Sequence, residues 1–180
     1  MLGEVDVIVD EFLRWADGRE GHWELRGGAP FRLPPENALH ARVKTCAAIA
    51  FMSAIKRAKA PCEALVQGLA VRVDARCAFL PDALAACSPL TADQMDADSP
   101  SIALEVLSPS TAAFDHGAKL EGYFSLPSLA HYLLIDPERR VVIQHSRGRE
   151  GVIETRILRD GEVKLNPPGL AFAFAELFGD

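Results

Sequence analysis

Two acidic residues stand in apolar segments where a carboxylate is costly to bury. Asp82 lies in the run FLPDALAAC, and Glu105 lies in the run SIALEVL. Because strand side chains alternate between faces, each acid shares a face with the apolar residues two positions away. An isolated ionised carboxylate is strongly disfavoured there unless it is paired or bound to a metal ion. If the two segments form neighbouring strands, both carboxylates can approach one cation, so the sequence predicts a metal site.

The expected cation is Mg²⁺, with Mn²⁺ as the second candidate, because two carboxylates plus water molecules suit a hard divalent ion. A predicted helix over about residues 112–125 follows the Glu105 strand directly. On this helix Asp115, Lys119 and Tyr123 are spaced by four residues and share a face. Lys119 can therefore reach back over the end of the strand. There it would orient an attacking water molecule, help to deprotonate it, and stabilise negative charge on phosphorus.

Simpler interpretations of the same residues stay open. Asp82 follows Pro81 and could be an ordinary turn acid. Glu105 could form a buried salt bridge, with Lys119 itself as the partner. Lys119 and Asp115 could be a surface pair that contributes only a few tenths of a kcal/mol.

Other chemistries find little support. Ser110-Thr111 is interpreted as a helix cap, since no G-x-S-x-G motif is present. The histidines show no metal-ligand spacing, and His40, on a predicted long helix, is interpreted as structural, with a place near the site as the alternative. The basic cluster of Lys56, Arg57 and Lys59 is interpreted as charges at a helix C-terminus, with contact to phosphate as the alternative.

Composition sets the class of protein. The 180 residues predict a single domain over 1–180, and the net charge of −6 argues against a protein that coats nucleic acid through a general basic surface. No run approaches about 18 apolar residues, so no membrane contact is expected. The cysteines contain no C-x-x-C pair and are expected to be free, mostly buried thiols, which predicts a cytoplasmic location. They are Cys46, Cys62, Cys77 and Cys87.

Hydrophobic periodicity and turn residues predict a mixed α/β fold with a central sheet. The two main predicted helices span Val5–Ala16 and Glu36–Lys59, and the apolar tail Ala171–Phe178 predicts a last helical turn. A loop is expected over Ser88–Ser99, and a hairpin around Asp160-Gly161. The expected strands are His22–Arg26, Pro30–Leu33, Cys62–Val66, Leu69–Val73, Cys77–Ala86, Ile102–Leu107, Ala130–Ile135, Val141–Ser146, Val152–Leu158 and Val163–Leu165.

Several segments resemble one family of nucleases. The strings EFLRWAD, WEL, LPD and EVLSPSTAAFDHGAKLEGYFSLPSLAHYLLID resemble those of a large bacterial family of putative restriction endonucleases in the PD-(D/E)XK superfamily. The resemblance runs from about Val5 to Phe178. It implies a restriction endonuclease-like fold, a central mixed sheet flanked by helices, and Mg²⁺-dependent cleavage of phosphodiester bonds. DNA is the expected nucleic acid, and a homodimer is a further expectation.

The resemblance also implies site residues. The acids of the family correspond to Glu24, Asp82 and Glu105, and Lys119 takes the role of the lysine whose usual strand position is occupied by Leu107. Glu24 would support a second ion or a water ligand. The chain departs from the family pattern at residues 26–29, which read RGGA in place of acidic residues, and at residue 83, which is alanine where a β-branched residue is common.

Three hypotheses follow. The leading one is an Mg²⁺-dependent nuclease in which Asp82 and Glu105 bind the metal and Lys119 positions the water. The second is a catalytically inactive, nuclease-derived binding or regulatory module, which the acidic net charge favours. The third is a scaffold domain that dimerises through exposed strands, and it predicts that Asp82 and Glu105 lie far apart.

Overall fold

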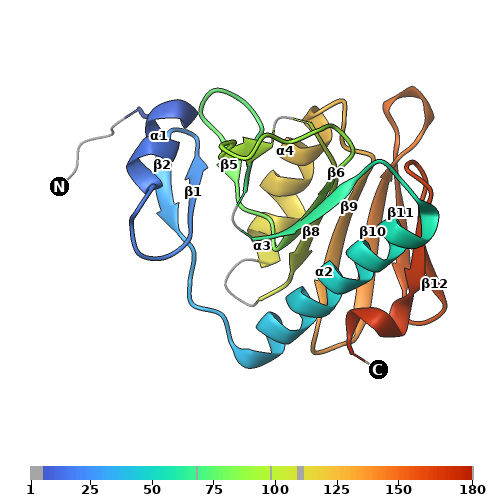
Figure 1. The fold of residues 1–180 in the computed structure, drawn as a ribbon. Coiled ribbons are helices and arrows are strands. Elements are labelled where there is room, and N and C mark those ends of the chain that lie inside the picture. Colours follow the sequence, from blue (N-terminus) through green and yellow to red (C-terminus); the bar gives the residue numbers. More distant parts are fainter. Residues whose placement is uncertain (1–5, 68, 98, 109–111, 180) are drawn as a thin grey trace.

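A six-stranded mixed sheet forms the centre of the molecule (Figure 1). The computed structural model describes residues 6–67, 69–97, 99–108 and 112–179. The strand order is β11-β10-β9-β8-β6-β3, and only the β8–β9 pair is parallel. This confirms the predicted α/β class with a central mixed sheet. The strands are β3 (Glu63–Val66), β6 (Ala83–Ala86), β8 (Pro100–Val106), β9 (His131–Asp136), β10 (Val141–Arg147) and β11 (Ile153–Leu158).

The long helix α2 (Ala38–Ala58) covers one face of this sheet (Figure 1). Its first turn is capped by the side chain of Asn37, which accepts a hydrogen bond from the backbone N–H of His40 at 2.9 Å. The hairpin of β12 (Glu162–Leu165) and β13 (Leu170–Ala173) packs into the same core, together with the 3₁₀ turn η3 (Phe174–Leu177). Apolar residues of α2 meet every second residue of β8, as the predicted alternation requires.

The length and composition of helix α2 are also those of a membrane-spanning helix, which was not expected from the sequence. By length and composition alone, its 21 residues are apolar enough to cross a membrane. In the structure the helix instead buries Val43, Ala47 and Phe51 against the sheet. A core helix of a globular protein meets the same criteria, so this property alone is not evidence of membrane contact.

A crossover helix covers the opposite face and connects the parallel strands β8 and β9. It consists of α3 (Ala112–Phe114), the π-helical turn η1 (Asp115–Lys119) and α4 (Leu120–Ser125). Aromatic residues of α4 pack on β8 and β9 in a second core cluster. The cap predicted at Ser110-Thr111 lies outside the described residues. A parallel pair requires such a crossover, so the helix begins just beyond the end of β8.

A smaller five-stranded sheet, in the order β2-β1-β5-β4-β7, forms the N-terminal side of the molecule. Helix α1 (Val9–Ala16) packs on it through Val9 and Phe12. The short turn η2 (Arg149–Gly151) connects β10 and β11 in the main sheet. The strands of the smaller sheet are β1 (Trp23–Arg26), β2 (Ala29–Arg32), β4 (Ala70–Arg72), β5 (Ala78–Phe79) and β7 (Asp96–Ala97).

Four predicted elements are wrong in detail. The strand predicted over Cys77–Ala86 is split between the two sheets, because Pro81 cannot donate to a ladder and the chain changes direction there. The loop predicted over Ser88–Ser99 contains β7, which pairs with β4. The hairpin predicted around Asp160-Gly161 does not form, since β11 pairs with β10 and β12 pairs with β13. The tail is strand up to Ala173 before its helical turn begins.

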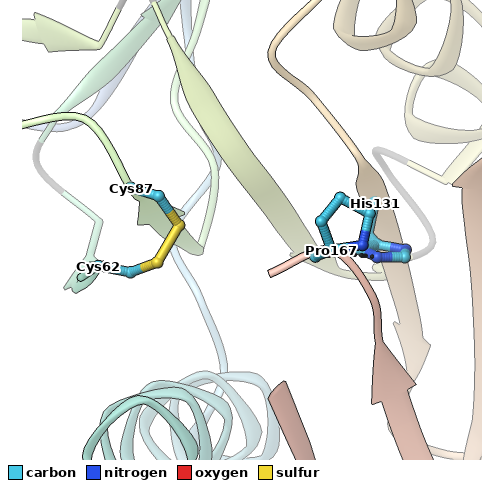
Figure 2. The surroundings of a disulfide bond; sticks show 4 residues. All are labelled: Cys62, Cys87, His131 and Pro167. Atoms are coloured by element: carbon cyan, nitrogen blue, oxygen red, sulfur yellow. Dashed lines mark hydrogen bonds between the residues drawn. A yellow bond between two sulfur atoms is a disulfide. The ribbon is translucent and has the colours of Figure 1, made fainter. Parts of the chain in front are cut away.

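A disulfide bond joins Cys62 and Cys87 (Figure 2). Cys62 directly precedes β3, Cys87 directly follows β6, and the antiparallel register of these strands, continued by one residue, sets the two cysteines opposite each other. The prediction of free thiols is therefore wrong for this pair and right for Cys46 and Cys77. Spacing along the chain did not reveal this strand pairing. The cytoplasmic location was inferred from free thiols, and the Cys62–Cys87 bond removes this support for two of the four cysteines. The location stays a prediction.

The same view shows how a proline-rich turn is tied to the main sheet. His131, at the start of β9, has Nε2 2.9 Å from the carbonyl oxygen of Pro167, which lies between β12 and β13 (Figure 2). Its other ring nitrogen lies 2.9 Å from the hydroxyl of Ser146. Burial lowers the pKa of His131, which favours the neutral ring in this network.

The disulfide predicts a thiol count. Unfolded, unreduced protein should expose two reactive thiols, from Cys46 and Cys77, and reduction should raise the count to four in a colorimetric titration. Reduction should also lower the free energy of unfolding by about 3 kcal/mol, because the bond closes a loop of about 25 residues. In a variant with both free cysteines changed to serine, reduction should lower the free energy of unfolding by the same amount. Four reactive thiols without reductant would contradict the bond.

Candidate metal and catalytic site

A pocket of about 460 Å³ opens where the parallel strands β8 and β9 end. The carboxyl ends of parallel strands are a common place for ligands to bind, because the connecting segments diverge there. Asp82, Glu105, Asp115 and Lys119 all line this pocket. The scaffold hypothesis predicted that the two strand acids lie apart, and the structure instead brings them to one place.

Strand pairing brings Asp82 and Glu105 together. In the antiparallel β6–β8 pair Ala83 lies opposite Leu104, and the same register continued by one residue sets Asp82 opposite Glu105. Asp82 Oδ2 accepts a hydrogen bond of 2.8 Å from the backbone N–H of Val106. Each carboxylate residue is only 5% exposed, which confirms the burial predicted from alternation. Asp82 lies in a bend directly before β6, so the turn interpretation is right for its backbone, while its side chain is buried and lines the pocket.

Lys119 is the cation of the site. Its Nζ lies 2.7 Å from Glu105 Oε1 and 2.8 Å from Glu24 Oε1. The Oδ1 atom of Asp115, one turn earlier, is 3.4 Å away. Lys119 is 2% exposed, so the interpretation of Lys119 and Asp115 as a surface pair is wrong. The buried salt bridge between Glu105 and Lys119, left open by the sequence, is present.

Glu24 is fully buried, and both of its carboxylate oxygens are occupied. Besides Lys119, Oε1 accepts a hydrogen bond of 3.0 Å from the backbone N–H of Leu80. Oε2 accepts two from Arg26, at 2.6 and 2.9 Å. Arg26 is in turn held between the rings of Phe31 and Phe114, each 3.7 Å from its guanidinium carbon. These contacts suit a residue that positions Lys119 better than a ligand of a second ion.

Burial and charge shift the ionisation of the site. Burial raises the pKa of Glu105 well above its ordinary value, Lys119 opposes that shift, and neighbouring carboxylates add to it. Burial likewise raises the pKa of Asp82. For Lys119 burial lowers the pKa, but the surrounding carboxylates outweigh it and the net shift is upward. Tyr123 donates a 2.9 Å hydrogen bond to Glu105 Oε1, and burial followed by that carboxylate raises its pKa, so the phenol stays a donor.

A row of polar residues on α2 and the segment before it also faces Asp82, and the alternative place of His40 near the site is the only part of this row that the sequence indicated. Glu36, His40 and Lys44 are spaced by four residues and face Asp82. His40 Nε2 lies 3.4 Å from Asp82 Oδ2, and Lys44 Nζ lies 3.9 Å from Asp82 Oδ1 and pairs with Glu36. Potential ligand atoms of Glu36, His40 and Asp82 all lie within 4.8 Å of one another. The regular spacing after Pro34-Pro35 was the signal that could have found this row.

Comparison with known proteins places this geometry in a family. Residues 9–176 match the model of the Uma2 family, described as putative restriction endonuclease. The chain belongs to the Uma2 family. The crystal structure of a putative nuclease of DUF820 from Anabaena variabilis ATCC 29413 matches this Uma2 chain with a TM-score of 0.74 and 19% identity, over 96% of this chain and 98% of that one. At this identity the likeness shows the fold. No curated protein matches the chain.

The residues of this Uma2 site fit a divalent cation. Among the described residues the pocket region buries four carboxylates, from Glu24, Asp82, Glu105 and Asp115, against the two buried lysines Lys44 and Lys119. Asp115 Oδ1 has no hydrogen-bond partner. The buried carboxylates outnumber the buried lysines here, and carboxylate oxygens are the ligands that Mg²⁺ and Mn²⁺ prefer.

Removing the Lys119 ammonium should destabilise the Uma2 chain strongly. Lys119→Met keeps the length of the side chain but leaves three buried carboxylates without their shared cation, at a cost of about 3–5 kcal/mol in the free energy of unfolding. Urea denaturation measures it, with the exposed Lys56→Met as the matched control, expected within about 0.5 kcal/mol of wild type.

The loss of stability caused by Lys119→Met should also depend on pH. The folded-state pKa of Glu105 is raised, so the neutral acid is favoured on folding, and this contribution is lost as pH rises through the folded pKa. The cost of Lys119→Met is thus expected to be largest near neutral pH and to shrink as pH falls. An equal cost at all pH values would be inconsistent with this account.

Proposed function

We propose that this Uma2-family chain is a metal-dependent endonuclease that hydrolyses phosphodiester bonds of nucleic acid, with DNA as the expected substrate. One observation carries the proposal, namely that Asp82 and Glu105 are buried in one pocket with Lys119 held against Glu105. Asp82 and Glu105 would hold Mg²⁺, with Mn²⁺ as the second candidate. Such a cation supplies Lewis-acid polarisation of the phosphate and a more acidic water molecule.

The contacts of the two carboxylates support their role as ligands. The N–H of Val106 fixes Asp82 through Oδ2, and Lys119 and Tyr123 both hold Glu105 through Oε1. Within the described residues no hydrogen bond reaches Glu105 Oε2. A carboxylate held at one oxygen presents the other in a fixed direction, which reduces the entropy lost on binding a ligand.

Lys119 would act as a fixed positive charge. Its raised pKa keeps the side chain protonated, so the ammonium is suited to orienting a water molecule and stabilising negative charge on phosphorus. A protonated Lys119 cannot accept a proton, so the same shift argues against the expected role of Lys119 in deprotonating the water molecule. Glu24 would position Lys119 from the opposite side, as its contacts suggest.

One observation favours the rival hypothesis of a binding or regulatory module without turnover. Glu36, Asp136 and Glu138 line the pocket, and the chain carries a net charge of −6. Carboxylates at a pocket repel the phosphates of nucleic acid unless cations or a basic surface compensate them. The two hypotheses separate on turnover. The cytoplasmic location and the homodimer also remain predictions.

Nuclease activity is the direct test. Wild-type protein incubated with plasmid, short duplex DNA and RNA in Mg²⁺ or Mn²⁺ should cleave at least one substrate, as seen on denaturing gels. Asp82→Asn and Glu105→Gln should each lower the rate by about 10²-fold or more, because each removes a charged ligand. Glu121→Ala, at an exposed acid on α4, is the matched control and should retain activity. Metal binding without cleavage of any substrate would favour the binding module.

Metal affinity should rise with pH. Because the pKa values of Asp82 and Glu105 are raised, protons compete with the cation for these carboxylates. As the pH falls, metal binding should therefore weaken by up to about tenfold per pH unit for each proton displaced. Calorimetric titration with Mn²⁺ from about pH 5 to about pH 8, in buffers of different ionisation enthalpy, measures the affinity and the protons released. Glu105→Gln should release fewer protons. An affinity that does not change with pH would count against these ligands.

A further inference from the structure

Strand β11 is an uncovered edge of the main sheet. It pairs with β10 on one side, and no described element pairs with its other side. The opposite edge strand, β3, is different, because α2 packs against it and the disulfide ties its end to β6. Five of the six residues of β11 are exposed. An unpaired strand edge presents free backbone N–H and C=O groups to any strand that can add to it.

The residue pattern of β11 is complementary to itself in the antiparallel direction. Ile153, Thr155 and Ile157 lie on one face of the strand, while Glu154 and Arg156 lie on the other. When two copies are aligned about Thr155, Ile153 lies opposite the partner's Ile157, and Glu154 lies opposite the partner's Arg156. Two-fold symmetry makes each of these pairs occur twice. Apolar and opposite-charge pairs across strands both stabilise a sheet.

The exposure of these side chains agrees with a role between chains. Ile153 is 39% exposed and Ile157 is 64% exposed, although both belong to a regular strand. Within the described part of the chain, neither Glu154 nor Arg156 forms an ion pair. In the β10–β11 pair Ile157 lies opposite Ile143, so the exposed isoleucine extends an apolar row of the sheet towards its edge.

We propose that two copies of this chain dimerise by antiparallel pairing of their β11 strands about Thr155. The two six-stranded sheets then form one continuous sheet across an isologous interface. None of the residues that line the metal pocket belongs to β11, so the interface leaves both pockets open. The proposal does not rest on nuclease activity and can be tested without it.

Charge reversal tests the register directly. In the proposed register, Glu154→Arg creates two arginine–arginine pairs across the interface, because each new arginine lies opposite Arg156 of the other copy. Arg156→Glu creates two glutamate–glutamate pairs in the same way. In sedimentation equilibrium, each single variant should raise the dimer dissociation constant by about tenfold or more over wild type. The double variant Glu154→Arg/Arg156→Glu should return it to near the wild-type value. An equimolar mixture of the two single variants should form mixed dimers, since their charges are complementary.

A hydrophobic substitution gives an independent measurement. Ile157→Lys should also weaken the dimer, whereas Ile49→Lys, at an exposed isoleucine of α2 that is 57% exposed, should not. The thermal unfolding midpoints of the five variants are expected to stay close to that of wild type once dimerisation is accounted for. A wild-type chain that remains monomeric throughout the concentration series would overturn the proposal. So would a dimer that both single charge variants form as tightly as wild type.

Discussion

The buried ammonium of Lys119 is the contact on which the candidate site depends. It joins Glu24 of the small sheet to Glu105 of the main sheet and Asp115 of the crossover helix, and Glu24 is about 80 residues or more from the other two. Three carboxylates this deep in a protein repel one another and are poorly solvated, so they need a cation to remain close. The two sheets and the helix therefore meet through one charge as well as through apolar packing.

Around this contact, the architecture sorts the four buried carboxylates into different tasks. Glu24 is saturated by Lys119, Arg26 and a backbone N–H, which makes it a support. Glu105 and Asp82 keep part of their capacity to accept ligands, and burial raises the pKa of both carboxyl groups. Arg26 and Lys119 bind the same carboxylate, so Arg26 influences the position of Lys119 through Glu24.

The sequence indicated the central residues of the site because strand alternation and helix spacing are local patterns, whereas the pairing of β6 with β8 was only a condition of the prediction. The alternation around Glu105 and the four-residue spacing of Asp115 and Lys119 were enough to place three of the groups in one pocket. The role of Glu24 depended on family resemblance, since nothing in a four-residue strand announces which sheet it joins. Glu36 and Lys44 were missed, and His40 was interpreted as structural, because their partner Asp82 lies on another element and only tertiary packing brings them together. The Cys62–Cys87 bond was missed for the same reason.

The π-helical turn at Asp115–Lys119 makes the site sensitive to chain length. A π-turn contains about one residue more than an α-turn, and one residue corresponds to about 100° of rotation around a helix axis. Deleting a residue between Phe114 and Leu120 would convert the turn to ordinary α-helix and rotate Asp115 and everything before it away from Tyr123. Substitutions at the exposed residues His116, Gly117 and Ala118 are expected to be tolerated, whereas an insertion or deletion here would separate Lys119 from Asp115. Related chains that keep the chemistry should therefore conserve the spacing here more strictly than the identity of the intervening residues.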